Sequence, residues 1–308
     1  MRVWLRRLGL ALAASLAAAA ITLLHLSSED YGDYVSSRRP TLIGSRVEGV
    51  SQEGGVRKSW IEISGSGGLS VECGVLEPKD PRGTHPAIVL LGGRASGRRA
   101  IDNAPGTLPD VIVLAVDYRL DGPEPDSVVA ALEVVPAVRR RIFEVPLRAI
   151  LAVDYLRSRK DVDPSRVILV GFSFGALFVP CVAVEDGRFA AAVMVQGGGG
   201  LTSLIRHNLE PWTDEATSFS AAALAGLLLR PMDPERFAPR VSPVPLLLLN
   251  GTKDSRVPRR NVEALFDKAR EPKKLVWLDL EHVDPKRPEI VGEIVTVLAR
   301  ELKALRAI

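Results

Sequence analysis

The sequence has few of the residues that build metal centres and disulfide frameworks. It contains two cysteines, Cys73 and Cys181, and four histidines among 308 residues, and none of them form a cluster with metal-ligand spacing. We therefore expect neither a metal nor another cofactor. We expect the two cysteines to be buried free thiols, with one disulfide between them as the alternative.

An excess of charge of one sign is also lacking. The net charge is +3, and basic and acidic residues are interspersed along the chain. The densest basic run, Arg139–Arg141, is short and typical of a solvated helix face, so no nucleic-acid partner is expected. Apolar residues form 46% of a chain whose length suits one α/β domain and an appendage. Such a chain can bury a sizeable core without disulfide or metal support.

Residues 1–26 differ in composition from the rest of the chain. Three arginines within residues 1–7 precede an uncharged stretch over residues 8–24. Its length is close to the ~20 apolar residues that span a bilayer. We expect a signal anchor, with a cleaved signal peptide or a hydrophobic surface helix as alternatives. The arginines would remain cytoplasmic, so the folded domain is expected to be membrane-anchored outside the cytoplasm, or secreted or periplasmic after cleavage. Residues 27–57 are expected to be a linker.

From residue 58 onward, short apolar runs alternate with longer segments of helical pattern. The last six of eight such runs are almost continuously apolar, as strands covered on both faces are. The alternation predicts an α/β domain over residues 58–308, with a mostly parallel eight-stranded sheet and helices on both faces. The first two runs predict an antiparallel hairpin at one edge. The expected strands are Lys58–Ser64, Leu69–Leu76, Ala87–Leu91, Val111–Val116, Arg166–Val170, Ala191–Val195, Pro245–Leu249 and Leu275–Leu280.

An insert separates two of these strands at residues 197–243, and it is far longer than an ordinary crossover. It contains Trp212, Phe219 and the apolar run Ala221–Leu229. We expect a small helical cap over an active site, with a single long crossover helix as the alternative. The other expected helices are Leu147–Ser158, Ala176–Val184, Asn261–Ala269 and Pro288–Ala307.

Ser173 is the candidate nucleophile. It lies at the centre of Gly171–Gly175, after the apolar run Val167–Val170 and before a helix-compatible stretch. A serine on a tight strand-to-helix turn has strained backbone, and glycines two positions away on either side avoid clashes. Such a turn exposes the hydroxyl and directs the first N–H groups of the helix at a developing oxyanion. An ordinary glycine-rich turn is the alternative.

With these motifs, the chain resembles the α/β-hydrolase superfamily over most of the expected α/β domain. Residues 154–175 resemble that superfamily's helix, loop, strand and nucleophile turn in order. Residues 243–258 resemble its acid-bearing strand end, and the segment around His282 resembles its histidine loop. The resemblance implies a catalytic triad of Ser173, Asp254 and His282, as in serine esterases and related acyl hydrolases.

The chemistry of these residues supports the same assignment. A serine hydroxyl becomes nucleophilic when a base takes its proton, and imidazole suits this task at neutral pH. The imidazole needs a carboxylate on its other nitrogen, and the chain order serine, aspartate, histidine is the one that this fold requires. Asp254 could instead be only a turn residue, and His282 a surface-loop histidine. Glu281 and Asp284 are rivals for orienting the imidazole.

Backbone N–H groups are expected to bind the oxyanion. One donor is expected from Phe174, directly after the nucleophile. The superfamily pattern favours the Arg94 N–H as the second, with Gly93 next. Many members carry His-Gly in this loop, whereas this chain has Gly92-Gly93. The His-Gly-Gly-Gly loop of the hormone-sensitive-lipase-like branch is absent.

Together these features predict a serine hydrolase that cleaves a carboxylic ester or related acyl bond of a small molecule through an acyl-enzyme on Ser173. The alternatives within enzymes are a serine peptidase or an acyl-CoA thioesterase of the same fold, or acyl transfer to an acceptor other than water. The alternative from another class is a non-catalytic binding protein of this fold. No pattern in the sequence indicates an oligomeric state.

Overall fold

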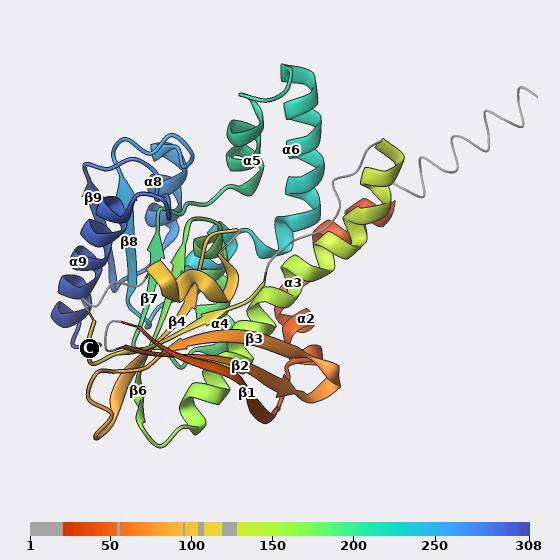
Figure 1. Ribbon diagram of the computed structural model, residues 1–308. Helices are drawn as coiled ribbons and strands as arrows, with labels where there is room; N and C mark the ends of the chain where they lie inside the picture. Colours follow the sequence, from red (N-terminus) through yellow and green to blue (C-terminus); the bar gives the residue numbers. More distant parts are fainter. Residues whose placement is uncertain (1–20, 54–55, 95, 104–107, 119–127) are drawn as a thin grey trace, which may run out of the picture.

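A twisted sheet forms the centre of the molecule (Figure 1). The computed structural model describes residues 21–53, 56–94, 96–103, 108–118 and 128–308. Within these residues the sheet has nine strands in the order β1-β2-β3-β5-β4-β6-β7-β8-β9. The strands are β1 Leu42–Glu53, β2 Val56–Gly65, β3 Ser70–Leu76, β4 His85–Leu91, β5 Ile112–Val116, β6 Val162–Phe172, β7 Ala191–Val195, β8 Leu246–Gly251 and β9 Lys273–Leu278.

Strands β4 to β9 are parallel, and β1, β2 and β3 are antiparallel to their neighbours. This arrangement confirms the predicted α/β fold with a mostly parallel sheet. The predicted number of strands is wrong, because β1 is an additional strand. It lies at the edge of the sheet. The antiparallel pair predicted for the edge, β2–β3, is therefore one strand further in. The large apolar residues Ile43, Val47 and Val50 of β1 are exposed. Backbone pairing with β2, which leaves no mark in composition, therefore holds this strand.

The segment before β1 also packs on the domain. Helix α2 (Tyr31–Arg38) begins after Asp30, whose carboxylate accepts hydrogen bonds from the first N–H groups of the helix. The buried Tyr31 hydroxyl donates to the Phe143 carbonyl at 2.7 Å, in helix α3 (Val128–Ser158). The expectation that residues 27–57 are a linker is therefore wrong.

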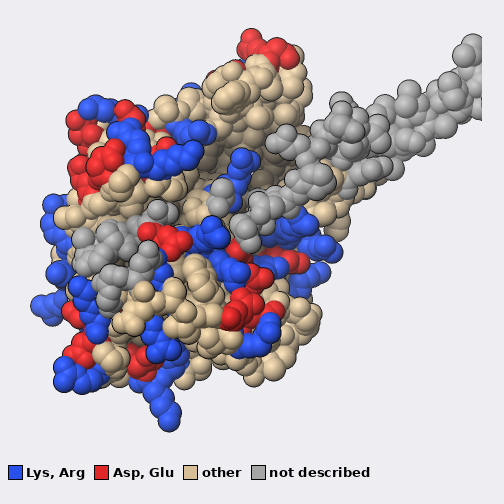
Figure 2. All heavy atoms as spheres, in the orientation of Figure 1, with Lys and Arg blue, Asp and Glu red and all other residues tan. Residues whose placement is uncertain are grey.

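Arg139 on α3 faces the same contact region. Its guanidinium donates to Glu29 Oε2 at 2.7 Å and lies over the Phe143 ring, 3.9 Å from the ring centroid. The side chain is 13% exposed, so this member of the basic run does not lie on a solvated face. Figure 2 shows basic and acidic side chains interspersed over the visible face of the molecule.

Helices cover both faces of the sheet, with one apolar cluster on each face. Alternate residues of β4 enter different clusters: Val89 packs with α3 and α4, and Ile88 and Leu90 pack with α9. Cys73 and Cys181 are buried and unpaired, as predicted. The remaining α-helices are α4 Val179–Asp186, α5 Leu201–Leu209, α6 Glu215–Leu229, α7 Pro234–Phe237, α8 Arg259–Lys268 and α9 Pro288–Ala304.

The insert at residues 197–243 contains α5, α6 and α7. Figure 1 shows α5 and α6 side by side, projecting from the body of the molecule. Gly226 permits their close approach, because a Cβ at this position would lie 1.9 Å from Thr202 Oγ1. A single crossover helix, the alternative for this insert, is not what the structure has.

The expected anchor or signal at residues 1–26 lies almost entirely outside the described residues, which begin at Ile21. In the part of the chain that the structure describes, no helix has the length and apolar character to cross a membrane.

Candidate active site

Ser173 stands on a strained turn between β6 and the short 3-10 helix η3 (Ser173–Phe178). Its φ is +51°, a left-handed conformation that is uncommon for residues other than glycine. Two glycines allow the turn to pack closely against its own backbone and against the end of β4. A Cβ on Gly171 would lie 2.5 Å from the Gly175 carbonyl oxygen, and one on Gly175 would lie 2.2 Å from the Leu91 carbonyl oxygen. The turn thus holds the serine directly beside the end of β4.

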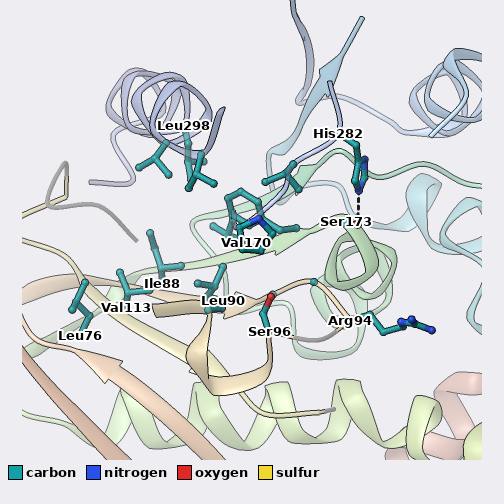
Figure 3. Close-up of a pocket in the computed structure, with 18 of the residues that line it drawn as sticks. Leu76, Ile88, Leu90, Arg94, Ser96, Val113, Val170, Ser173, His282 and Leu298 are labelled. Atoms are coloured by element: carbon teal, nitrogen blue, oxygen red, sulfur yellow. Dashed lines mark hydrogen bonds between the residues drawn. The ribbon is translucent and has the colours of Figure 1, made fainter. Parts of the chain in front are cut away.

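The structure brings the three predicted triad residues together. Ser173 Oγ lies 2.7 Å from His282 Nε2 (Figure 3), and His282 Nδ1 lies 2.7 Å from Asp254 Oδ2. The rival carboxylates lie elsewhere: Glu281 pairs with Arg287, and Asp284 accepts from the Lys286 N–H. A hydroxyl, an imidazole and a carboxylate connected in this way can move a proton away from Ser173 during nucleophilic attack.

Asp254 is fixed by its own loop. Its side chain is 1% exposed, and its Oδ1 accepts hydrogen bonds from the backbone N–H groups of Arg256 (2.8 Å) and Val257 (3.0 Å). These two bonds orient the carboxylate and leave Oδ2 for the imidazole. Asp254 is therefore both a turn residue and the partner of His282.

Gln196 is a site residue that the sequence analysis missed. It follows β7, is 1% exposed and has a φ of +50°. Its Nε2 donates to the Glu281 carbonyl at 2.7 Å, and its Oε1 accepts from the Val283 N–H, so the amide contacts the backbone on both sides of His282. The available signal was a polar residue directly after an apolar strand, the same signal that singled out Asp254.

The candidate oxyanion donors lie around the nucleophile. The Phe174 N–H belongs to the first turn of η3, where backbone donors have no partner within the helix. Gly93 and Arg94 line the same cavity as Ser173. The Tyr118 hydroxyl donates to the Gly92 carbonyl and holds the start of their loop. Which of Gly93 and Arg94 supplies the second donor stays a prediction.

Two cavities meet at Ser173 and His282. One, here called the sheet cavity, has a volume of about 300 Å³ and lies between the sheet and α9. The other, called the cap cavity, has a volume of about 400 Å³ and lies under α5. Arg94 and Arg256 line both, and both residues are exposed. These volumes are in the range of small-molecule sites.

The model of the prolyl oligopeptidase family matches residues 149–286, which include the three triad positions. An uncharacterized protein, YfhR, from Salmonella typhi is 32% identical over 142 residues, covering 43% of this chain and 46% of that protein. YfhR from Escherichia coli strain K12 is 30% identical over 135 residues, covering 43% and 44%. The chain thus matches less than half the length of these curated relatives.

Solved structures show the likeness of the fold. Acetyl xylan esterase 1 from Thermoanaerobacterium sp. JW/SL YS485 has a TM-score of 0.61 and 17% identity, covering 82% of this chain and 87% of that one. The acetyl xylan esterase from Paenibacillus sp. R4 has a TM-score of 0.63 and 18% identity, covering 86% and 92%. The Pyrococcus furiosus esterase Pf2001 has a TM-score of 0.55 and 17% identity, covering 85% and 91%.

These comparisons and the sheet topology define the fold. The chain has the α/β-hydrolase fold, and the part that carries Ser173, Asp254 and His282 is similar to the prolyl oligopeptidase family.

Proposed function

We propose that the protein is a serine hydrolase that cleaves a carboxylic ester or related acyl bond of a small molecule. The observation that carries this proposal is the connected series Ser173–His282–Asp254 on a strained turn, with both hydrogen bonds at 2.7 Å. A histidine on a solvated surface loop is not expected to contact a buried carboxylate through one ring nitrogen and a partly buried serine on a strained turn through the other.

The reaction would proceed through an acyl-enzyme. Ser173 Oγ attacks the acyl carbon while His282 Nε2 takes its proton, and Asp254 stabilises the resulting imidazolium. Backbone N–H groups of Phe174 and of the Gly93–Arg94 loop bind the oxyanion. The carbonyl re-forms as the leaving group departs with the proton from His282. Water then attacks the acyl carbon and gives a proton to His282, and His282 returns that proton to Ser173 Oγ as the bond to the acyl group breaks and the acid departs.

A peptidase is the second candidate, favoured by the match to the prolyl oligopeptidase family model. The chemistry at Ser173 would be the same, except that the leaving group would be an amine instead of an alcohol. An acyl-CoA thioesterase, or transfer to an acceptor other than water, also uses this acyl-enzyme. The substrate, rather than the triad, therefore separates these activities.

The test compares p-nitrophenyl esters with aminoacyl anilides as substrates of the wild type, Ser173→Ala and Ser165→Ala. Ser165 is exposed at the opposite end of β6 and serves as the matched control. We expect ester hydrolysis to exceed anilide hydrolysis, to fall by at least about 10³-fold in Ser173→Ala, and to be unchanged in Ser165→Ala. Faster cleavage of the anilides would replace the esterase proposal by the peptidase.

We also propose that the N-terminal segment attaches the protein to a membrane, with the catalytic domain outside the cytoplasm. The uncharged stretch over residues 8–24 after three arginines supports this. Protease treatment of intact cells or spheroplasts should digest the domain. If the domain is digested only after the cells are lysed, it lies in the cytoplasm and the proposed orientation is wrong.

A further inference from the structure

The two cavities point to a class of substrate, and this inference rests on the proposed hydrolase activity. We propose that the natural substrate is an ester with an apolar group on each side of the scissile carbonyl, one held in the sheet cavity and the other in the cap cavity. The wall composition of each cavity and their common junction support this.

The sheet cavity has apolar walls along its length. Alternation along the strands directs one set of side chains to the α9 face, and α9 supplies the opposite wall (Figure 3). Among the described lining residues, the charged side chains are Arg94, Arg256 and, when protonated, His282. Figure 3 shows Arg94 directed away from the apolar walls. The walls include Ile88, Leu90, Val113, Val170, Val295 and Leu298.

The cap cavity is apolar as well, but elements from the other face of the sheet form it. Phe174 and Leu177 line it from the nucleophile helix, and Leu204 and Leu209 line it from α5. Asn208 brings an amide, but its Nδ2 already donates to the Leu204 and Arg256 carbonyls. An alkyl or aromatic group fits these walls better than a sugar does.

The junction explains why both sides of the substrate matter. Ser173 and His282 line both cavities, so the carbonyl carbon under attack lies where they meet. The acyl group and the leaving group diverge from that carbon, and each cavity offers space for one of them. Hydroxyl groups of a carbohydrate would lose water against these walls and would find few side-chain partners, chiefly Ser96, Arg94 and Arg256, which weakens binding. We therefore expect this chain to act poorly on acetylated sugars, although acetyl xylan esterases share its fold.

The experiment uses two series of esters: straight-chain acyl groups of increasing length on one fixed alcohol, and alcohols of increasing length on one fixed acyl group. We expect kcat/KM to rise in both series, by up to about fourfold per methylene that is buried. Acetylated xylo-oligosaccharide is the polar comparison. A flat profile in either series, or a preference for the oligosaccharide, overturns the proposal.

Cavity-filling variants test which side of the substrate each cavity binds. Val295→Phe narrows the sheet cavity and Leu204→Phe narrows the cap cavity, while Thr296→Phe and Ser220→Phe place the same ring at exposed positions on α9 and α6. Each filling variant should lower kcat/KM at least tenfold for the long members of one series and spare the short ones. If both leave the length profiles unchanged, the proposal is wrong.

Cavity-enlarging variants and an active-site probe complete this test. Should a filling variant fail to fold, Leu298→Ala and Leu209→Ala enlarge the two cavities and should move the optimum to longer chains. A small fluorophosphonate probe reports on Ser173 without filling either cavity. Labelling with flat length profiles refutes the substrate class alone, whereas absent labelling refutes the proposed function itself.

A second inference rests on a different observation, the pairing of Gln196 with the histidine loop. We infer that Gln196 is a positioning residue for His282. Its buried amide satisfies the Glu281 carbonyl and the Val283 N–H, so it fixes the backbone on either side of the imidazole. A Cβ on Gly251 would lie 2.3 Å from the Leu280 carbonyl oxygen, so the end of β8 confines the loop from another side.

Gln196→Met keeps the length of the side chain and removes both hydrogen bonds. We expect kcat to fall about 10- to 100-fold, as for residues that support a directly acting group. Because Gln196 also lines the cap cavity, KM is compared on short-chain esters, for which it should stay within about twofold of wild type. Asn250→Met, which removes the buried bond from Asn250 Nδ2 to the Gly197 carbonyl, is the matched control for lost stability. A kcat within about twofold of wild type in folded Gln196→Met overturns the inference.

Gln196→Glu adds a readout that lost stability alone would not produce. A protonated glutamic acid can donate to the Glu281 carbonyl and accept from the Val283 N–H, whereas a carboxylate cannot donate. The kcat of Gln196→Glu relative to wild type should therefore fall as the pH rises. A constant ratio across the pH range contradicts the positioning role.

Discussion

Gly175 shows how one residue permits the nucleophile turn. The position of its missing Cβ lies 2.2 Å from the Leu91 carbonyl oxygen and 2.5 Å from that of Gly92, and neither backbone group can move without shifting the end of β4. Because the Gly93–Arg94 loop continues from this point, the same contact holds the proposed oxyanion donors beside Ser173.

Gly175→Ala should consequently lower both stability and activity. We expect a loss of about 1–3 kcal/mol in the free energy of unfolding, as for other overpacked sites, together with a reduced kcat for ester hydrolysis. Urea denaturation and kinetics on one ester measure the two effects. Gly292→Ala on α9, where a Cβ meets nothing within 4 Å, is the control. Wild-type kcat in Gly175→Ala would show that the contact is not needed.

Candidate residues could be selected from the sequence where chemistry restricts the residue type. Ser173, Asp254 and His282 could be found because nucleophile, acid and base follow strand ends in a required order. Gln196 carries the weaker signal of a polar residue after an apolar strand, and its role could not be predicted because it depends on contacts with a loop that follows β9, far along the chain. The second oxyanion donor, in addition to the Phe174 N–H, could not be identified from the sequence either, since almost any residue type supplies a backbone N–H.

Among the secondary-structure elements, α2 and β1 differ most from expectation. Strands buried on both faces are continuously apolar, and the sequence revealed them. An edge strand contributes little to the core, and α2 binds through Tyr31 and Val35, which are its buried residues. Composition alone therefore suggested a linker.

Tyr31→Ala tests whether this segment is part of the domain. Removing a buried aromatic side chain should cost about 3–5 kcal/mol in the free energy of unfolding. Ile43→Ala, at a position 72% exposed on β1, should change it by less than about 0.5 kcal/mol. Denaturant titration of both variants provides the measurement. Equal, small effects would show that residues 27–57 behave as a linker after all.

Helix α9, which forms one wall of the sheet cavity, is connected to β9 by a pH-sensitive contact. The Lys274 ammonium and the Arg300 guanidinium hold the pKa of the Glu301 carboxyl below its ordinary value. A lowered pKa in the folded state means that the stabilisation is present above the unfolded-state pKa, about 4.3, and is lost as the pH falls through the folded-state value.

Glu301→Gln should therefore reduce the free energy of unfolding at pH 7 and reduce its decline between about pH 5 and pH 3. Urea denaturation across this range measures both. If the variant and the wild type lose stability in parallel on acidification, Glu301 does not contribute to the acid sensitivity.

At the scale of the whole molecule, the pattern of apolar runs predicted the fold class, since six parallel strands and their covering helices each bury a recognisable face. The two cavities could not be predicted, because a cavity depends on how side chains from β4, α9 and α5 meet in space. The activity of the molecule is nonetheless proposed to depend on one atom, Ser173 Oγ, at their junction.

Fluorophosphonate labelling of the full chain, followed by mass spectrometry of its peptides, tests this claim most directly. The probe reacts with a serine that an adjacent base activates. We predict a single adduct on Ser173 in the wild type, none in Ser173→Ala, and strongly slowed labelling in His282→Ala. A folded wild-type protein that stays unlabelled, or a Ser173→Ala variant labelled as fast as the wild type, would contradict Ser173 as the nucleophile.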